Sequence, residues 1–354
     1  MAMAAWRSVI LDVLLQRWIV QSLSYQSHKS VCSATFCANA HAIVTGPTSG
    51  IGKAIATALA LHGSRVVLAC RSVDRGNSAK RDILHIAPDA DLTVLLCDTS
   101  SLSSVRKFVS NAANVLHNRV DIFISNAGIF SMNEKDRTLS PDGLESHWAT
   151  NFVCPAVLLL KLLPLMRHSP EVHSGRRARI VLVSSKLHML GHVDTNDPNF
   201  STSSKRRYSP LAAYAQSKEA EELFADVISQ RLSDPQRCLP DTSPLVMTVH
   251  PGNVLTSVVR TLPSLIQTMY RKFLQYLLLS PEEGARAPLY CATRGEAEVE
   301  SHHLRGSFGS NCRVVEKTPM HERADQVLKR MQLDGHVSSS ELEEAIAGPE
   351  EERK

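Results

Sequence analysis

A short apolar segment that runs into a glycine-rich turn and then into a helical pattern constrains the fold of this chain most. Residues 41–45 (HAIVT) read as a buried strand, residues 46–52 (GPTSGIG) form the turn, and residues 53–62 have helical periodicity. Glycines let the backbone approach a ligand with no Cβ in the way, and a helix N-terminus offers free N–H groups and partial positive charge. The sequence therefore predicts a diphosphate-binding loop here, with a plain turn between strand and helix as the alternative.

Further apolar segments follow, spaced so that a helix fits between each pair. They are residues 65–70, 92–97, 120–124, 180–183 and a sixth segment before Pro251. Such alternation is typical of an α/β fold, and we expect a single Rossmann-type doubly wound parallel sheet flanked by helices on both faces. The chain has 354 residues, of which 43% are hydrophobic, enough for one large core. We expect the domain to span residues 41–315, between an N-terminal segment, 1–40, and a polar helical C-terminal tail, 316–354.

Polar side chains follow the second and third segments, where a dinucleotide fold reads the adenosine end of its ligand. The second segment ends on Cys70 and Arg71, so no carboxylate would repel a 2′-phosphate and a guanidinium could pair with it. This arrangement favours NADP over NAD. After the third segment, Asp98 and Thr99 could accept a hydrogen bond from the adenine amino group, or cap the helix that begins near Ser101.

Tyr214 and Lys218 are four residues apart, a spacing that places a phenol and an ammonium on one face of a helix. A neighbouring cation favours the phenolate, so the pair can transfer protons near neutral pH. Taken alone, the pair is more typical of an ordinary surface helix, and the other motifs are needed to favour the catalytic interpretation. Residues 125–128 (SNAG) close the fourth segment, and their small side chains would let a cofactor lie across the sheet.

These motifs occur in a fixed order: residues 45–52, 126–128, Asn151, Ser185, Tyr214, Lys218 and Pro251-Gly252. In order and spacing they resemble the short-chain dehydrogenase/reductase family, over roughly residues 40 to 310. Within the family, residues 69–72, 205–210 and 250–256 are most similar to the retinol-dehydrogenase-like branch.

The resemblance implies an oxidoreductase that transfers hydride between NADP(H), or else NAD(H), and a lipophilic alcohol or carbonyl. Tyr214 would be the general acid or base, and Lys218 would support it and hydrogen-bond the nicotinamide ribose. Ser185, with Ser184 as the nearer rival, would orient the substrate oxygen, and Asn151 would hold a water that links Lys218 to solvent. The implied cofactor-binding residues lie at strand ends and in the motifs: Gly46, Ser49, Gly50, Ile51, Gly52, Arg71, Asp98, Thr99, Asn126, Ala127, Gly128, Tyr214, Lys218, Pro251, Gly252, Val254 and Thr256.

Two positions depart from the family pattern. Ser125 stands where the family usually has a second asparagine, and residues 152–155 (FVCP) replace a more usual His-Leu-Gly run. Neither change removes a reacting group. A reading from another class is a regulatory or developmental protein that binds a nucleotide with little or no turnover, but the intact Ser185, Tyr214 and Lys218 favour the enzyme.

Charge and cysteine content argue against other classes of protein. The net charge of +4 is too small and too dispersed for a nucleic-acid binder, and we expect the basic residues 205–207 to form a solvated loop. The 8 cysteines have no zinc-binding spacing, so we expect no metal site and no disulfide framework, which favours an intracellular, reducing compartment. They are Cys32, Cys37, Cys70, Cys97, Cys154, Cys238, Cys291 and Cys312. The chain has no GxSxG motif, which argues against a serine hydrolase.

The N-terminal 40 residues lie outside the motif order. Residues 9–20 are apolar but are interrupted by Asp12, Gln16 and Arg17, too often for a convincing membrane-spanning helix. An amphipathic helix over residues 5–23 that makes peripheral membrane contact fits better. An organelle transit peptide and a helix packed on the catalytic domain are the alternatives.

Two later segments carry further expectations. Residues 255–280 are apolar and basic, and in this family the corresponding region covers the substrate, although it could equally contact a membrane or the second subunit of a homodimer. The chain is polar after residue 311, and we expect a serine among Ser338, Ser339 and Ser340 to cap a helix ahead of the acidic terminus.

Overall fold

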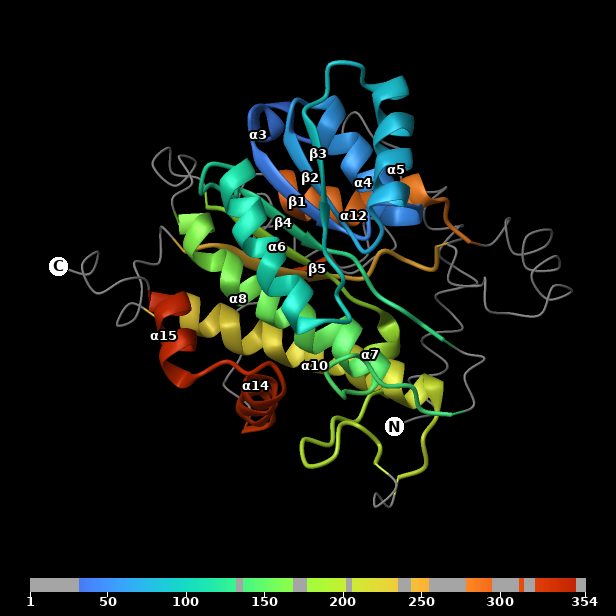
Figure 1. Cartoon of the computed structure of the whole chain (residues 1–354), viewed down its shortest axis with the longest axis vertical. Helices are drawn as coiled ribbons and strands as arrows, with labels where there is room; N and C mark the ends of the chain where they lie inside the picture. The colour runs from blue at the N-terminus through green and yellow to red at the C-terminus, as the bar shows by residue number, and fades with distance from the viewer. Residues whose placement is uncertain are drawn as a thin grey trace, which may run out of the picture.

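A single mixed sheet organises the protein, as the computed structural model in Figure 1 shows. The model describes residues 32–131, 136–167, 177–201, 206–234, 243–254, 278–294, 312–314 and 322–347. Within these residues, 7 strands are ordered β3-β2-β1-β4-β5-β6-β7. They are β1 (His41–Thr45), β2 (Arg65–Cys70), β3 (Leu92–Leu96), β4 (Ile122–Ser125), β5 (Arg179–Val183), β6 (Leu245–Val249) and β7 (Cys312–Val314). The first six run parallel, as expected, and β7 is antiparallel to β6 at the edge.

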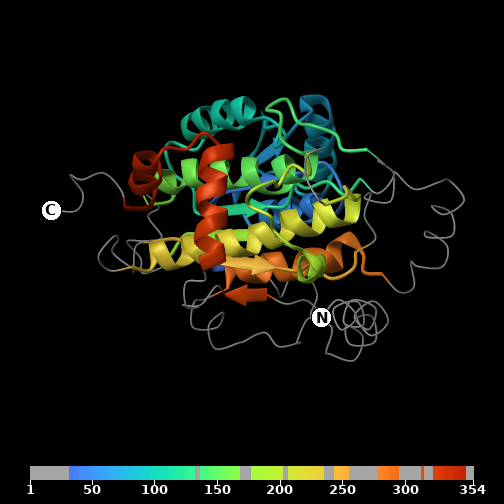
Figure 2. The same ribbon diagram turned by 90° about the horizontal axis from the view of Figure 1, so that it is seen from below.

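Side chains of the central strands alternate between two buried layers. In β1, Ile43 belongs to one hydrophobic core, whereas Ala42 and Val44 belong to the other. The first core is covered by α6 (Leu102–Val115), α7 (Ser146–Trp148), η1 (Ala149–Val153), α8 (Cys154–Arg167) and α10 (Pro210–Leu232). The second is covered by α3 (Ala34–Cys37), α4 (Gly50–Leu61), α5 (Val73–Ile86) and α12 (Pro281–Thr293). Helices therefore cover both faces of the sheet (Figure 2).

The strand order reverses between β1 and β4, and this reversal fixes where a ligand can bind. From β1 the chain builds outward through β2 and β3, and then returns to add β4 on the other side of β1. The loops that leave β1 and β4 consequently diverge and open a crevice beyond the carboxyl ends of these strands. The predicted strand-end residues that the structure describes lie at this edge of the sheet.

Two helices near the C-terminus complete the first core. The segment expected as a polar tail contains α14 (Glu322–Asp334), which lies against α10, and α15 (Ser339–Ala347), which lies against α8 (Figure 2). Ser338 caps α15, as expected, because its hydroxyl accepts a hydrogen bond from Glu341 N at 3.1 Å. The fully buried Trp148 donates its indole N–H to Asp334 Oδ2 at 2.8 Å, so the last helices are joined to the segment that precedes α8.

One described helix, Ser146–Arg167, is long and apolar enough by composition to cross a membrane, but 83% of its apolar window is buried within the protein. It is therefore a core helix. The N-terminal helix expected over residues 5–23 lies outside the described residues, as does most of the apolar segment, residues 255–277.

Two sequence expectations are wrong. Arg206 does not belong to a solvated loop: its guanidinium donates to the Asp197 carbonyl at 2.9 Å and lies over the Phe200 ring at 4.3 Å. Cys291 is disulfide-bonded, although no disulfide was expected. Local composition reveals neither the contacts of Arg206 nor the disulfide of Cys291. Among the residues that the structure describes, the free cysteines are Cys32, Cys37, Cys70, Cys97 and Cys154.

We expect Asp334→Ala to lower the free energy of unfolding by about 1–3 kcal/mol, because it leaves the Trp148 indole N–H buried without its acceptor. Urea denaturation would measure the change. Asp82→Ala is the matched control, since it removes an exposed ion pair with Lys53 and should leave the midpoint nearly unchanged. Equal midpoints for the two variants would show that the buried contact contributes nothing.

Candidate active site

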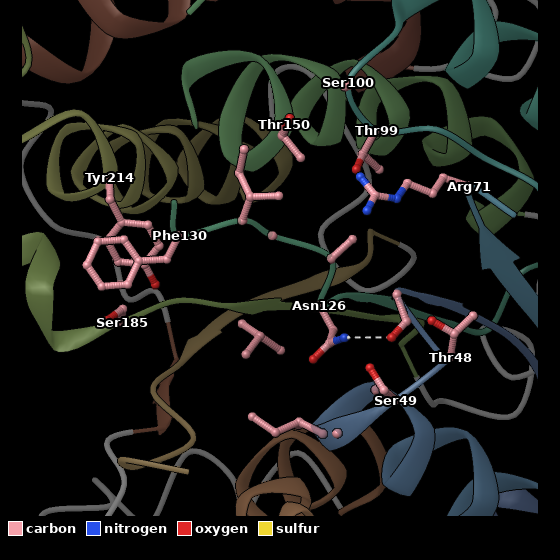
Figure 3. Close-up of a pocket in the computed structure, with 18 of the residues that line it drawn as sticks. Thr48, Ser49, Arg71, Thr99, Ser100, Asn126, Phe130, Thr150, Ser185 and Tyr214 are labelled. Carbon is pink, nitrogen blue, oxygen red and sulfur yellow. Dashed lines mark hydrogen bonds between the residues drawn. The ribbon is translucent and has the colours of Figure 1, made fainter. Parts of the chain in front are cut away.

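The crevice beyond the strand ends holds a pocket of about 850 Å³ (Figure 3). Its wall is built from the segments that follow β1, β2, β3, β4, β5 and β6 and from the first turns of α4 and α10. The wall includes every described residue that the sequence assigned to the cofactor: Gly46, Ser49, Gly50, Ile51, Gly52, Arg71, Asp98, Thr99, Asn126, Ala127, Gly128, Tyr214, Lys218, Pro251, Gly252 and Val254. Thr256 lies outside the described residues.

The glycine loop between β1 and α4 fits tightly against the end of β4. Gly46 and Gly50 have φ of +66° and +58°, which a side chain would strain. A Cβ on Gly52 would overlap with Asn126 Nδ2 and the Gly46 carbonyl. Asn126 in turn donates from Nδ2 to the Thr45 carbonyl at 2.9 Å. The free N–H groups at the start of α4 are thus held at the pocket wall, which suits a phosphate.

At the end of β2, Arg71 extends its guanidinium into the pocket toward Thr99 (Figure 3). Asp98 accepts from Ser100 N at 2.9 Å, whereas α6 is capped by Ser101, whose hydroxyl accepts from Ser104 N at 3.4 Å. The capping role considered for Asp98 is therefore wrong. The ends of β2 and β3 thus both contribute polar groups to the pocket, and Arg71 at the end of β2 adds a positive charge.

Tyr214 and Lys218 lie one turn apart at the start of α10, and both line the pocket. The Lys218 side chain is only 6% exposed, and Nζ donates to the Val183 carbonyl at 2.9 Å and to Glu221 Oε2 at 2.9 Å. Ser185 follows β5 and lies near Tyr214 on the pocket wall (Figure 3). Its neighbour Ser184 also lines the pocket, although its hydroxyl is buried.

The charges around Lys218 act on one another strongly because they are buried. Burial by itself lowers the pKa of Lys218, but the opposing charges of Glu221 and Tyr214 raise it above its ordinary value. Burial also raises the pKa of Glu221 to about 7, although Lys218 and the Ser184 hydroxyl both oppose that rise. Tyr214 and Lys218 are thus close enough to be electrostatically coupled, as their spacing predicts.

Asn151 lies behind the pocket wall instead of lining it. It sits in the π-helical turn η1, and its amide both accepts from Ile129 N at 2.8 Å and donates to Ile129 O at 3.0 Å. It also donates to Ser217 Oγ at 3.0 Å, and that hydroxyl donates to the Tyr214 carbonyl at 2.7 Å. Asn151 therefore joins the irregular segment after β4 to the first turns of α10. Local π-helical turns are frequent at functional sites.

The structure adds three residues that the sequence did not single out. Phe130 packs its ring on Tyr214, with centroids 4.4 Å apart and planes tilted by 32°. Glu221 pairs with Lys218 from outside the pocket wall. His250 lines the pocket, and both of its ring nitrogens are buried without a hydrogen-bond partner. Burial lowers the pKa of His250 to about 3, so it is a neutral imidazole at physiological pH. Of these three residues, only His250 could have been noticed in the sequence, because it directly precedes the Pro251-Gly252 motif.

Comparison with known proteins connects this geometry to known enzymes. The model of the short chain dehydrogenase family matches residues 40–195. The chain is 33% identical to the dehydrogenase/reductase SDR family member FEY of Arabidopsis thaliana, covering 82% of this chain and 73% of that protein. This relative bears out the particular similarity of the branch-specific stretches to the plant oxidoreductase Forever Young. Mouse polyprenol dehydrogenase is 36% identical, with 82% and 80% covered, and human retinol dehydrogenase 13 is 31% identical, with 81% and 80% covered.

Solved structures share the architecture. An uncharacterised protein from Mycobacterium paratuberculosis superposes with a TM-score of 0.62 at 26% identity, covering 88% of this chain and 97% of that chain. A metagenomic short-chain oxidoreductase in complex with NADP superposes with a TM-score of 0.51 at 22% identity, covering 74% and 93%. The strand order, the glycine loop and these relatives lead to one assignment: the chain belongs to the short-chain dehydrogenase/reductase family of oxidoreductases.

Proposed function

We propose that this protein is an NADP(H)-dependent oxidoreductase that interconverts a lipophilic alcohol and its carbonyl compound, with Tyr214 as general acid or base. The observation that carries the proposal is the joint placement of Tyr214, Lys218 and Ser185 on the wall of a pocket that also contains the glycine loop. The tight fit around Gly52 supports a dinucleotide, because the backbone there is free of any Cβ and presents N–H groups.

Each side chain has one task in this scheme. When bound, the nicotinamide supplies or accepts the hydride. Tyr214 gives its proton to the substrate oxygen during reduction and takes it back during oxidation. Lys218 uses two of its three N–H donors on Val183 and Glu221, which leaves one for a ribose hydroxyl. Ser185 orients the substrate oxygen by a hydrogen bond. The hydrogen bond from Asn151 to Ser217 holds the turn that carries Tyr214 in place. Asn151 would also hold a water that links Lys218 to solvent.

The lipophilic substrate class is supported by the side chains near the reacting groups. Phe130 and Leu187 line the pocket beside Tyr214 and Ser185. Apolar walls favour apolar ligands because binding removes both surfaces from water. The names of two relatives, polyprenol dehydrogenase and retinol dehydrogenase 13, agree with that class.

Replacing the phenol tests the reaction directly. We expect Tyr214→Phe to lower the rate of NADPH oxidation by about 10²–10⁴-fold, the usual contribution of a positioned acid or base, while NADPH still binds. The assay would use retinoid, steroid and aliphatic carbonyls, and thermal shifts would measure NADPH binding. Tyr208→Phe is the control, because Tyr208 packs on Phe200 outside the pocket. Absence of turnover by the unaltered protein on every carbonyl would favour a nucleotide-binding regulatory protein instead.

The cofactor preference depends on Arg71. We expect Arg71→Ala to weaken NADPH binding by about 10–100-fold and to leave NADH binding nearly unchanged, because only NADPH carries the phosphate that a guanidinium can pair with. Thermal shifts at equal ligand concentrations would measure both affinities. Arg81→Ala, at an exposed position of α5, controls for a general loss of positive charge. If NADPH and NADH stabilise the unaltered protein equally, the assignment of Arg71 is wrong.

A further inference from the structure

A buried carboxylate stands directly behind the catalytic pair. Glu221 lies three residues after Lys218 on α10, and the side chains of both are 6% exposed, with Lys218 Nζ and Glu221 Oε2 2.9 Å apart. Glutamate and lysine are almost never buried to this extent unless they are paired. Lys218 lines the pocket and Glu221 does not, so the carboxylate acts on the pocket only through the ammonium.

A second, much smaller cavity adjoins Glu221. Its volume is about 10 Å³, close to what a single water molecule needs. Two of its lining side chains are polar, Glu221 and Asn151, and the others are apolar: Phe152, Pro155, Ala156, Leu159, Leu182 and Phe224. A water there would have two polar side chains, Glu221 and Asn151, beside it.

The groups that face Glu221 decide its charge. Lys218 and the Ser184 hydroxyl favour the carboxylate, whereas Glu222 on the same helix disfavours it. Burial outweighs the favourable contacts and brings the pKa of Glu221 to about 7. Glu221 therefore changes charge near neutral pH, where general acid–base catalysis operates.

We propose that Glu221 is a positioning residue that, through Lys218, sets the pH range over which Tyr214 exchanges its proton with the substrate. The inference rests on the proposed function of Tyr214. It assigns Glu221 two effects: the carboxyl oxygen holds the ammonium in place, and the negative charge offsets part of the positive charge that Tyr214 experiences.

The direction of the charge effect follows from the sign of each group. When Glu221 is protonated, the full charge of Lys218 stabilises the Tyr214 phenolate. When Glu221 is ionised, part of that charge is neutralised and Tyr214 holds its proton more tightly. An ionised Glu221 therefore shifts the ionisation of Tyr214 to higher pH. The shift is absent below the pH at which Glu221 itself loses its proton.

Glu221→Gln separates the two effects, because the amide keeps an oxygen acceptor for Lys218 and removes the charge. The phenolate absorbance that belongs to Tyr214, obtained as the difference from the same protein carrying Tyr214→Phe, should shift to lower pH by about one unit. The rate of alcohol oxidation should match the unaltered protein below about pH 6 and exceed it by up to about tenfold near pH 8. Glu221→Leu removes the acceptor as well, and should lower the rate across the whole pH range.

Glu222→Gln is the matched control. It removes one carboxylate from the adjacent position of α10, and Glu222 faces His188 at 4.0 Å. Its profile should move much less than that of Glu221→Gln. An unshifted phenolate titration, or a rate that falls by the same factor at every pH, would overturn the inference. The titration needs no turnover, so its result stands even if the unaltered protein oxidises no alcohol, an outcome that would refute only the proposed function.

Discussion

The hydrogen bond from Lys218 to the Val183 carbonyl joins α10 to the end of β5, and the geometry of the site depends on that junction. The bond ties α10, which packs on one face of the sheet, to the carboxyl end of β5. Tyr214, one turn earlier on the same face, is then placed over the crevice without further contacts of its own hydroxyl. Because the ammonium is buried, its charge acts with less screening than it would in water. The buried Lys218 ammonium thus helps to position the Tyr214 phenol and also supplies the positive charge that acts on it.

The parts of the fold that local sequence determines were predictable. β1 and β2 begin and end where their apolar runs do, and β3 stops one residue before the predicted boundary, at Leu96. The glycine turn was identifiable because Gly46 and Gly50 have a backbone conformation that other residues rarely adopt. Tyr214 and Lys218 were identifiable because residues four positions apart on a helix lie on the same face. Each of these features depends on neighbours in the sequence.

The residues that sequence analysis missed or misplaced depend on packing between distant segments. Glu221 reads as a solvated helix charge, but α10 is buried between the sheet and α14, so charged side chains on its inner face must find partners. The Asn151 amide holds the Ile129 backbone, a contact that the sequence does not indicate. The cation–π contact of Arg206 with nearby Phe200 and the disulfide of Cys291 also have no signal in composition. No pattern along the chain distinguishes these residues from exposed counterparts.

The turn that contains Asn151 also determines what covers Tyr214. Glu145 is fully buried, and its carboxylate accepts from Trp148 N and from His147 Nδ1, each at 2.8 Å. His147 Nε2 then accepts from Ser131 N at 3.2 Å, an arrangement that places the imidazole proton on Nδ1. Since Asn151 holds Ile129 and His147 holds Ser131, one short helical segment fixes both neighbours of Phe130. The ring that packs on Tyr214 is thus oriented by buried polar contacts, which are directional, in addition to apolar packing, which is not.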